Sequence, residues 1–183
     1  TWSMPGEVGH DEKLVPYTYD LKRARKLLKE AGYEKGFVLK MLVSDQAARE
    51  ANALAAQWEK IGVHTTLTVV SMGEAFQEWG KPEKLWDCYG NLCPDPVGHI
   101  FFTYGISMFS KSPFSGYQDK AFDALFERMF AAVDTREHEN AAREVDRYVY
   151  EKSMGVFTYQ RMKIYGVRND VDCTPHPSGS LYL

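Results

Sequence analysis

The chain has 183 residues, 44% hydrophobic and 26% charged, a composition typical of a soluble globular domain that needs no disulfide or metal to hold its core. Its net charge of −3 gives no basic surface of the kind that binds nucleic acid. No apolar run approaches the ~20 residues that a transmembrane helix requires. The length predicts a single domain over residues 1–183.

The first half of the chain has the pattern of a helix followed by a strand–helix–strand unit. The first helix is predicted to begin after Asp20, a good N-cap, and to end at Gly32. Residues 37–43 (FVLKMLV) are apolar nearly throughout, as in a strand covered on both faces. A helix over 47–61 and a β-branched strand over 63–70 follow. Strands connected in this way are expected to be parallel, with a right-handed crossover.

The middle of the chain shows weaker patterns. Residues 72–79 are predicted to form a short helix and residues 86–89 a short strand. Residues 90–118 are rich in proline and glycine, so this stretch is expected to be mostly loop.

Two helices with apolar faces are predicted next, the second beginning at a capping box of Asp134 and Glu137. Residues 155–159 and 162–167 are candidates for late strands. The apolar face of the first of these helices consists of Phe122, Leu125, Phe126, Met129, Phe130 and Val133.

Segments spread along residues 17–169 carry motifs that occur together, in this order, in one family. The segments are 19–37 (YDLKRARKLLKEAGYEKGF), 56–63 (AQWEKIGV), 86–87 (WD) with 94–96 (PDP), 114–125 (with FSGY and FDAL) and 134–136 (DTR). This pattern resembles the extracellular solute-binding proteins of the oligopeptide, dipeptide and nickel ABC importer class.

The resemblance implies a fold and a function. In that family two lobes joined by a hinge enclose the ligand, so residues 1–183 would be the second lobe, with the first lobe absent. The fold would be α/β, a lobe of the type II periplasmic-binding-protein kind with a mostly parallel central sheet and helices on both faces. The function would be solute capture for an ABC importer, in the periplasm or outside the cell, at the membrane through the importer. Its partners would be a small-molecule or peptide-like solute, the permease subunits and the missing first lobe.

One stretch departs from the family's peptide-binding members. These carry a tryptophan followed by an acidic residue that pairs with the free amine of the peptide. Here residues 89–96 (YGNLCPDP) are shorter, lack the tryptophan, and contain Asp95 as their one acid. A peptide with a free N-terminus is therefore in doubt as the ligand. The sequence does not choose among peptides, metal complexes, sugars, opines and glutathione.

The ligand is expected at the carboxyl ends of the strands, where loops leave an open parallel sheet. In the family resemblance the loops after residues 43 and 89 both face the cleft, so they should lie side by side. Asp45 could instead only cap the next helix, and Asn91 could only form a turn. The predicted ligand-binding residues are Ser44, Asp45, Gln46, Tyr89, Asn91, Leu92 and Cys93.

No catalytic or cofactor-binding motif appears, so neither an enzyme activity nor a cofactor is predicted. Cys88, Cys93, Asp95 and His99 are suitable zinc ligands by type, but their spacing matches no common structural zinc pattern, and no metal site is predicted. A Cys88–Cys93 disulfide is possible in an oxidising compartment, although half-buried thiols are favoured. The alternative function is a free-standing α/β enzyme or a regulatory small-molecule-binding domain.

Overall fold

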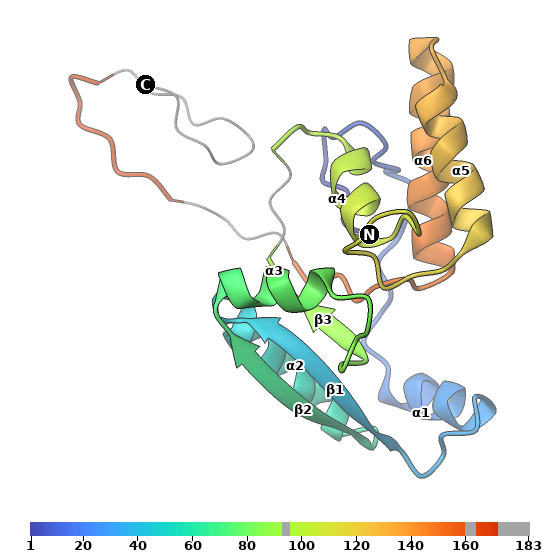
Figure 1. Cartoon of the computed structure of the whole chain (residues 1–183), viewed down its shortest axis with the longest axis vertical. Coiled ribbons are helices and arrows are strands. Elements are labelled where there is room, and N and C mark those ends of the chain that lie inside the picture. The colour runs from blue at the N-terminus through green and yellow to red at the C-terminus, as the bar shows by residue number, and fades with distance from the viewer. Residues whose placement is uncertain (93–95, 160–163, 172–183) are drawn as a thin grey trace. The chain divides into compact units, whose positions relative to one another are not determined.

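The computed structural model describes residues 1–92, 96–159 and 164–171, and the chain divides into two compact units. One unit comprises residues 16–93. The other comprises residues 1–15 together with residues 94–183. Figure 1 labels the helices and strands of both units.

Residues 16–93 fold around a parallel sheet of three strands in the order β2-β1-β3. The central strand is β1 (Phe37–Ser44), and it pairs along its full length with β2 (Val63–Val70). On its other side it pairs over three residues with β3 (Cys88–Gly90). The predicted parallel pairing of the first two strands is confirmed.

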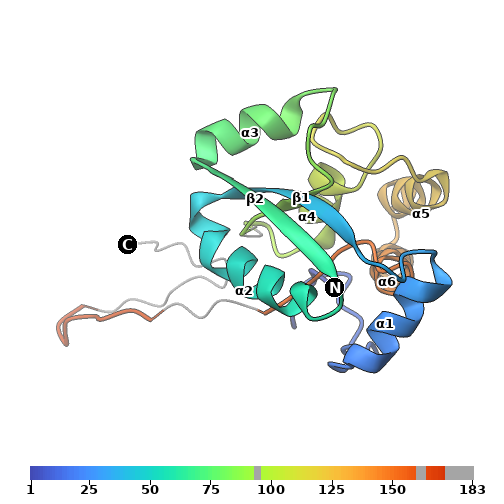
Figure 2. The same ribbon diagram turned by 90° about the horizontal axis from the view of Figure 1, so that it is seen from below.

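Helices cover both faces of this sheet, as predicted. A short 3-10 turn, η1 (Asp45–Ala47), leads from β1 into α2 (Ala48–Glu59), which packs on one face. On the opposite face lies α3 (Met72–Gly80), and Figure 2 shows the sheet between the two helices. Before the sheet comes α1 (Leu21–Glu30), where the side chain of Asp20 accepts the Arg23 N–H as an N-cap.

Alternation along β1 sends its side chains to the two faces. Met41 and Val43 are buried in a cluster with residues of η1 and α2. Leu42, between them, is 3% exposed and pairs in register with Tyr89 of β3, whose ring stacks on Trp79 of α3. The central strand is therefore buried on both sides, which explains its nearly continuous apolar sequence.

Two glycines meet where β1 and β2 begin. Gly36 and Gly62 have φ values of +76° and +85°, a region that L side chains rarely adopt. A Cβ added at Gly36 would lie 1.9 Å from the carbonyl oxygen of Gly62. That oxygen accepts the N–H of Phe37 at 3.1 Å and so starts the β1–β2 ladder. Position 36 therefore requires glycine for its backbone angle and for its lack of a side chain.

We expect Gly36→Ala to lower the free energy of unfolding by clearly more than the ~1 kcal/mol that a left-handed backbone costs a residue with a Cβ. Gly32→Ala is the matched control, since its φ is +86° but its added Cβ meets nothing within 4 Å. Urea denaturation followed by circular dichroism measures both variants. Equal losses would show that the approach to Gly62 does not matter.

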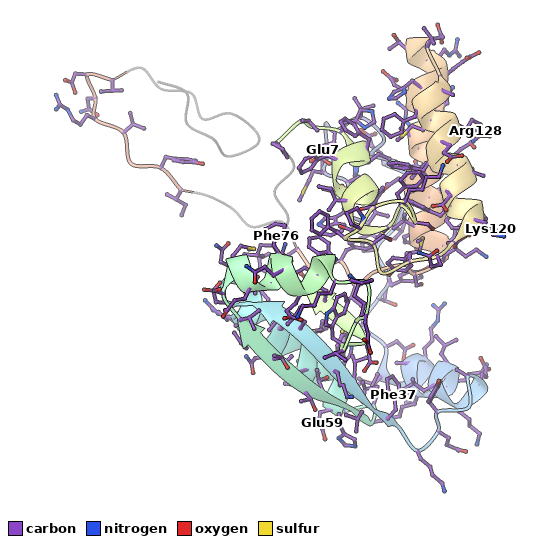
Figure 3. All side chains as sticks on the ribbon, in the orientation of Figure 1. Glu7, Phe37, Glu59, Phe76, Lys120 and Arg128 are labelled. Carbon is purple, nitrogen blue, oxygen red and sulfur yellow. The ribbon has the colours of Figure 1, made fainter. Side chains whose placement is uncertain are left out.

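In the described part of the second unit there are three helices, α4 (Ile100–Ser107), α5 (Lys120–Ala131) and α6 (Thr135–Glu151). The helices α5 and α6 lie side by side, and side chains fill the space between them and α4 (Figure 3). Asp134 caps α6 by accepting the N–H groups of Arg136 and Glu137. The buried apolar cluster includes Ile100, Tyr104, Met108, Phe122, Phe126, Met129, Ala142, Val145 and Val149.

Within residues 90–118, the stretch predicted to be mostly loop contains α4, so that part of the prediction was wrong. The helix begins at His99, whose ring Nδ1 accepts the N–H of Phe101 at 3.0 Å. Gly105 lies inside the helix, and a Cβ there would come within 3.1 Å of the Phe126 ring. The glycine permits close packing against α5 and does not mark a turn.

Two further predictions for this unit differ from the structure. Phe130 and Val133, assigned to the apolar face of α5, are 60% and 97% exposed. Val133 lies beyond Ala131, where the helix ends, whereas Phe130 lies in the last turn and contacts the rings of Phe101 and Phe126. Residues 155–159 are irregular, as are residues 164–167; the rest of the second strand candidate lies outside the described residues. Neither segment has a strand beside it within the described part of the chain, so no ladder forms.

A buried polar network fastens residues 1–15 to the helices of this unit. The carboxyl group of Asp146 on α6 is fully buried and accepts the Tyr104 hydroxyl at 2.6 Å and the Ser3 hydroxyl at 2.8 Å. The Tyr104 oxygen in turn accepts the N–H of Trp2 at 3.2 Å. Burial raises the pKa of Tyr104 well above its usual value, and the charge of Asp146 adds to this, so the hydroxyl remains a donor.

Removing the Tyr104 hydroxyl should cost stability, because Asp146 loses a donor and the Trp2 N–H loses its acceptor. We expect Tyr104→Phe to lower the free energy of unfolding by about 1.5–3 kcal/mol. Tyr150→Phe is the control, because the Tyr150 hydroxyl donates to Val15 O at an exposed site where water can replace it. A loss for Tyr104→Phe no larger than for the control, measured by urea denaturation, would contradict a stabilising role for the network.

Candidate functional site

The carboxyl ends of β1 and β3 meet at one edge of the sheet. Val43 lies opposite Gly90 in the parallel ladder, so the residues that follow, Ser44 and Asn91, are neighbours. The Ser44 hydroxyl donates to Asn91 Oδ1 at 3.1 Å. The predicted placement of the two strand exits side by side is confirmed for residues 44–46 and 89–92.

The residues at this edge differ in what they can reach. Ser44 is fully buried, so its hydroxyl serves Asn91 and cannot contact a solute. Asn91 is half-buried, and because its amide oxygen faces Ser44, its NH2 group points away from that hydroxyl. Asp45 and Gln46 are exposed. The edge therefore offers an oriented amide donor beside an exposed carboxylate.

Asp45 makes a local hydrogen bond that bears on its role as a helix cap. One of its carboxylate oxygens accepts the N–H of Gln46, the next residue, at 2.8 Å. The N-cap residue of α2 is Ala47, and no side chain caps that helix. Asp45 thus steadies the exit turn from β1, and its exposed carboxylate can accept hydrogen bonds or meet a cation.

Tyr89 and Leu92 pack against the two faces of the sheet. The Tyr89 ring stacks on Trp79 with centroids 4.7 Å apart and lies 6.0 Å from the ring of Trp86. Leu92 packs on the opposite face, against the cluster around Met41. These contacts support residues 90–92 from both sides, and a direct contact of either side chain with a solute stays a prediction.

Trp79 is a supporting residue that the sequence interpretation did not identify. It is 5% exposed and also contacts the ring of Phe76, at 5.9 Å. The available signal was the aromatic pair at positions 76 and 79, which lie on one side of a helix because they are three residues apart.

The predicted site residue Cys93 lies outside the described residues. So does Asp95, one of the four residues that are suitable zinc ligands by type. Cys88 is half-buried, and burial, with a smaller contribution from the charge of Asp87, raises the pKa of its thiol to about 11. His99 bonds through Nδ1 to the Phe101 N–H, and its Nε2 lies 2.6 Å from Nε2 of His138. Within residues 1–92, 96–159 and 164–171, no three His, Cys, Asp or Glu side chains form a group that could hold a metal ion.

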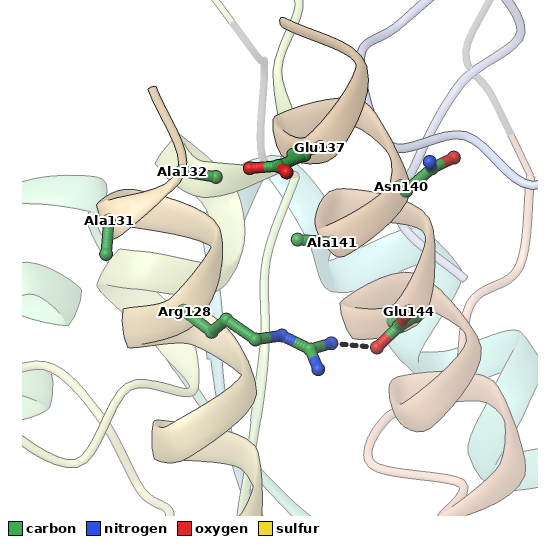
Figure 4. Close-up of a pocket in the computed structure, with 7 residues that line it drawn as sticks. All are labelled: Arg128, Ala131, Ala132, Glu137, Asn140, Ala141 and Glu144. Atoms are coloured by element: carbon green, nitrogen blue, oxygen red, sulfur yellow. Dashed lines mark hydrogen bonds and ion pairs between the residues drawn. The ribbon is translucent and has the colours of Figure 1, made fainter. Parts of the chain in front are cut away.

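A separate hollow of about 400 Å³ lies between α5 and α6 (Figure 4). An ion pair of Arg128 and Glu144 spans it, and three alanines form much of its wall. Those two charged groups already pair with each other. The hollow therefore offers a surface for packing and no strong case for a binding or catalytic site. It was not among the predicted sites.

None of the helices in the described part of the chain has the length and hydrophobicity required to cross a membrane.

The comparison with protein families shows to which family this chain belongs. The family model described as "Bacterial extracellular solute-binding proteins, family 5 Middle" matches residues 2–98, more than half of the chain. The chain belongs to this family. The resemblance seen in the sequence motifs is therefore confirmed.

Individual relatives resemble the chain over part of their length. The dipeptide-binding protein of Escherichia coli K12 is 36% identical over 73 residues, which are 36% of this chain and 14% of that protein. Heme-binding protein A of Haemophilus influenzae is 22% identical over 153 residues, 79% of this chain and 28% of that protein.

Solved structures of periplasmic binding proteins share the fold. DppA from Helicobacter pylori, solved in complex with the peptide STSA, is 25% identical with a TM-score of 0.67, over 82% of this chain and 30% of that one. An oligopeptide-binding protein, OppAIV, from Borrelia burgdorferi has a TM-score of 0.69 at 17% identity, over 83% and 32% of the two chains. The predicted type II periplasmic-binding-protein fold is confirmed, and this chain spans less than a third of the length of these relatives.

The raised pKa of Cys88 predicts that its thiol reacts slowly with alkylating reagents in this family 5 chain. Raising the pKa from 9.0 to about 11 leaves roughly 100-fold less thiolate at pH 8, and thiolate is the reactive form. With reductant present, iodoacetamide should therefore modify Cys88 far more slowly in the folded chain than in urea. Peptide mapping separates Cys88 from the other two cysteines. Equal rates in folded and unfolded protein would contradict the prediction.

Proposed function

We propose that this chain forms part of the ligand cleft of a solute-binding protein that delivers its solute to an ABC importer. Membership of family 5 supports the class of function. The observation that carries the proposal is the Ser44–Asn91 hydrogen bond, which joins two polar strand exits at the carboxyl edge of a parallel sheet. Ligands of open α/β sheets bind at such an edge.

The proposal includes the setting of the whole protein. Residues 1–183 would form the second of two lobes, and the first lobe would supply the other wall of the cleft. The protein would work in the periplasm or outside the cell, next to the permease subunits of its importer. The family consists of binding proteins, and we propose that binding without catalysis is the activity here.

Each residue at the edge has a proposed role. Asn91 would donate its amide N–H groups to the solute, and Asp45 would accept from a donor or meet a cation. Ser44 would act through Asn91, as a positioning residue that fixes the amide. Gln46 is exposed beside Asp45 and would add a neutral polar contact. Tyr89, Leu92 and Cys93 would complete the wall.

The ligand class is open between the kinds of solute that relatives bind. These relatives include a dipeptide-binding, a heme-binding and a glutathione-binding protein. All three kinds of solute carry carboxylate or amide groups that accept hydrogen bonds, so the amide donor of Asn91 suits each. The edge residues alone therefore support a solute with acceptor oxygens and do not choose among the three.

The test uses the full-length protein that contains this chain. The solute that co-purifies with it is identified by mass spectrometry, and its affinity is measured by isothermal titration calorimetry. We expect Asn91→Ala to weaken binding by at least about tenfold, which corresponds to ~1.4 kcal/mol for a lost hydrogen bond to a polar ligand. Ser44→Ala should weaken binding by a smaller factor, because the amide remains but is less well held.

Asn52→Ala is the matched control, since Asn52 lies on α2 and donates to the backbone oxygen of Ala48. It should leave the affinity unchanged. The free energy of unfolding of each variant, measured alongside, separates lost contacts from lost folding. Unchanged affinity in Asn91→Ala and Asp45→Ala would remove this edge from the ligand site.

A further inference from the structure

We propose that α1, with the tyrosines at its two ends, binds membranes that contain anionic phospholipid. The lipid-binding surface consists of the apolar stripe of α1, its basic residues and the flanking tyrosines. This inference concerns a surface separate from the sheet edge described above, and it does not depend on the proposed solute.

The apolar stripe of α1 is only partly covered, since Leu21, Ala24 and Leu28 are half-buried and Leu27 is exposed. Leu21, Ala24, Leu27 and Leu28 fall within one arc of the helix at ~100° per residue. No residue of α1 is buried, and Leu27 is 54% exposed. A helix of a soluble protein ordinarily buries such a stripe in its core, so this face is available to another surface.

Positive charge surrounds this stripe in a chain that is negative as a whole. The sequence of α1, LKRARKLLKE, holds five basic residues and one acidic residue, whereas the whole chain has a net charge of −3. Arg23 lies about 40° from Leu27 around the helix, and Arg25 about 40° from Leu21 on the other side. Basic residues therefore border the apolar stripe on both sides, as in helices that lie in a membrane interface.

Exposed tyrosines stand at both ends of the helix. Tyr17 and Tyr19 precede it and are 57% and 70% exposed, and Tyr33 follows it at 51%. The Tyr19 hydroxyl donates to the side chain of Gln57 at 3.0 Å, and the Tyr33 ring packs on Phe37 at 5.0 Å, so both rings are held in place. Tyrosine is enriched at the level of lipid headgroups, where its apolar ring and polar hydroxyl are both accommodated.

A hollow of about 470 Å³ beside α1 has the charge that a phosphate group requires. One carboxylate on its wall, Glu34, pairs with Lys29 at 2.6 Å, and the Arg25 guanidinium is anchored on the carbonyl of Lys60. The remaining positive charge can receive a lipid headgroup. The basic residues on its wall are Arg25, Lys26, Lys29, Lys35 and Lys60.

A membrane fits this combination better than another protein does. An acidic protein surface would match the charges but leave Leu27 and the tyrosines in water. A protein core would cover the leucines but would bury the bordering arginines without partners. A bilayer accepts leucines in its acyl region, tyrosines at the interface and basic groups at the phosphates.

The test measures sedimentation of the 183-residue chain with vesicles. We expect binding to vesicles of phosphatidylglycerol mixed with phosphatidylcholine, little binding to pure phosphatidylcholine, and weaker binding as salt is raised. Replacing Arg23, Arg25 and Lys29 by Gln should weaken binding at least about tenfold, because three charges near the anionic surface are lost. Gln is a good helix former, so α1 should persist, which circular dichroism checks.

The matched control replaces Lys120, Arg136 and Lys152 by Gln, three exposed basic residues of the other unit (Lys120 is labelled in Figure 3). Both triple variants have the same net charge, so a difference between them reports the surface and not the overall charge. The control should bind within about twofold of the unaltered chain. Leu27→Gln tests the apolar stripe and should weaken binding several-fold.

Three results would each overturn the proposal. The first is absence of binding to the anionic vesicles. The second is equal weakening in the two triple variants, which would mean that net charge alone acts. The third is full binding by Leu27→Gln, which would reduce the association to surface charge without docking of the helix.

Discussion

The parallel register between β1 and β3 is the constraint on which the candidate site depends. It places Val43 opposite Gly90 and so sets Ser44 next to Asn91 at the edge where both strands end. Because side chains alternate along a strand, a slip of β3 by one residue would send each of its side chains to the opposite face of the sheet. Tyr89 would then leave the α3 side, and Asn91 would lose the buried hydroxyl that orients its amide. The packing of the sheet and the geometry of the edge are thus set by the same ladder.

Much of the unit formed by residues 16–93 could be predicted because its signals are local. An apolar run, a helical period and a β-branched run in succession leave little choice but a parallel crossover unit. The end of β1 then fixes where Ser44 and Asp45 emerge. The side to which Tyr89 turns could not be predicted, because β3 has three residues and shows no alternation. Its contact with Trp79 depends on how α3 packs, which is a tertiary feature.

The unit containing residues 1–15 shows where local patterns fail. Its helices α5 and α6 have clear caps and apolar faces, but α4 was hidden by Gly105, whose role depends on the approach of Phe126. The irregular segment 155–159 has residues typical of strands, and strand formation depends on a partner that no pattern within the segment reveals. The network around Asp146 links residues that no sequence period connects, since Ser3 and Tyr104 come from distant parts of the chain.

The hydrogen bond between Ser3 and Asp146 joins residues 143 positions apart, and it encloses the whole of the sheet unit within one loop of the chain. During synthesis, residues 1–15 emerge before the sheet unit but find their partners on α6 only after all of residues 16–93 have emerged. The sheet unit, which is one continuous segment of residues 16–93, can fold in the meantime, because compact units generally fold as units during synthesis. Closing the larger loop afterwards adds little entropy cost beyond that of a shorter one, because this cost grows only with the logarithm of length. Folding of the sheet first shortens the effective distance that the chain must span. The order of events during synthesis therefore follows from the place of one serine ahead of the sheet unit.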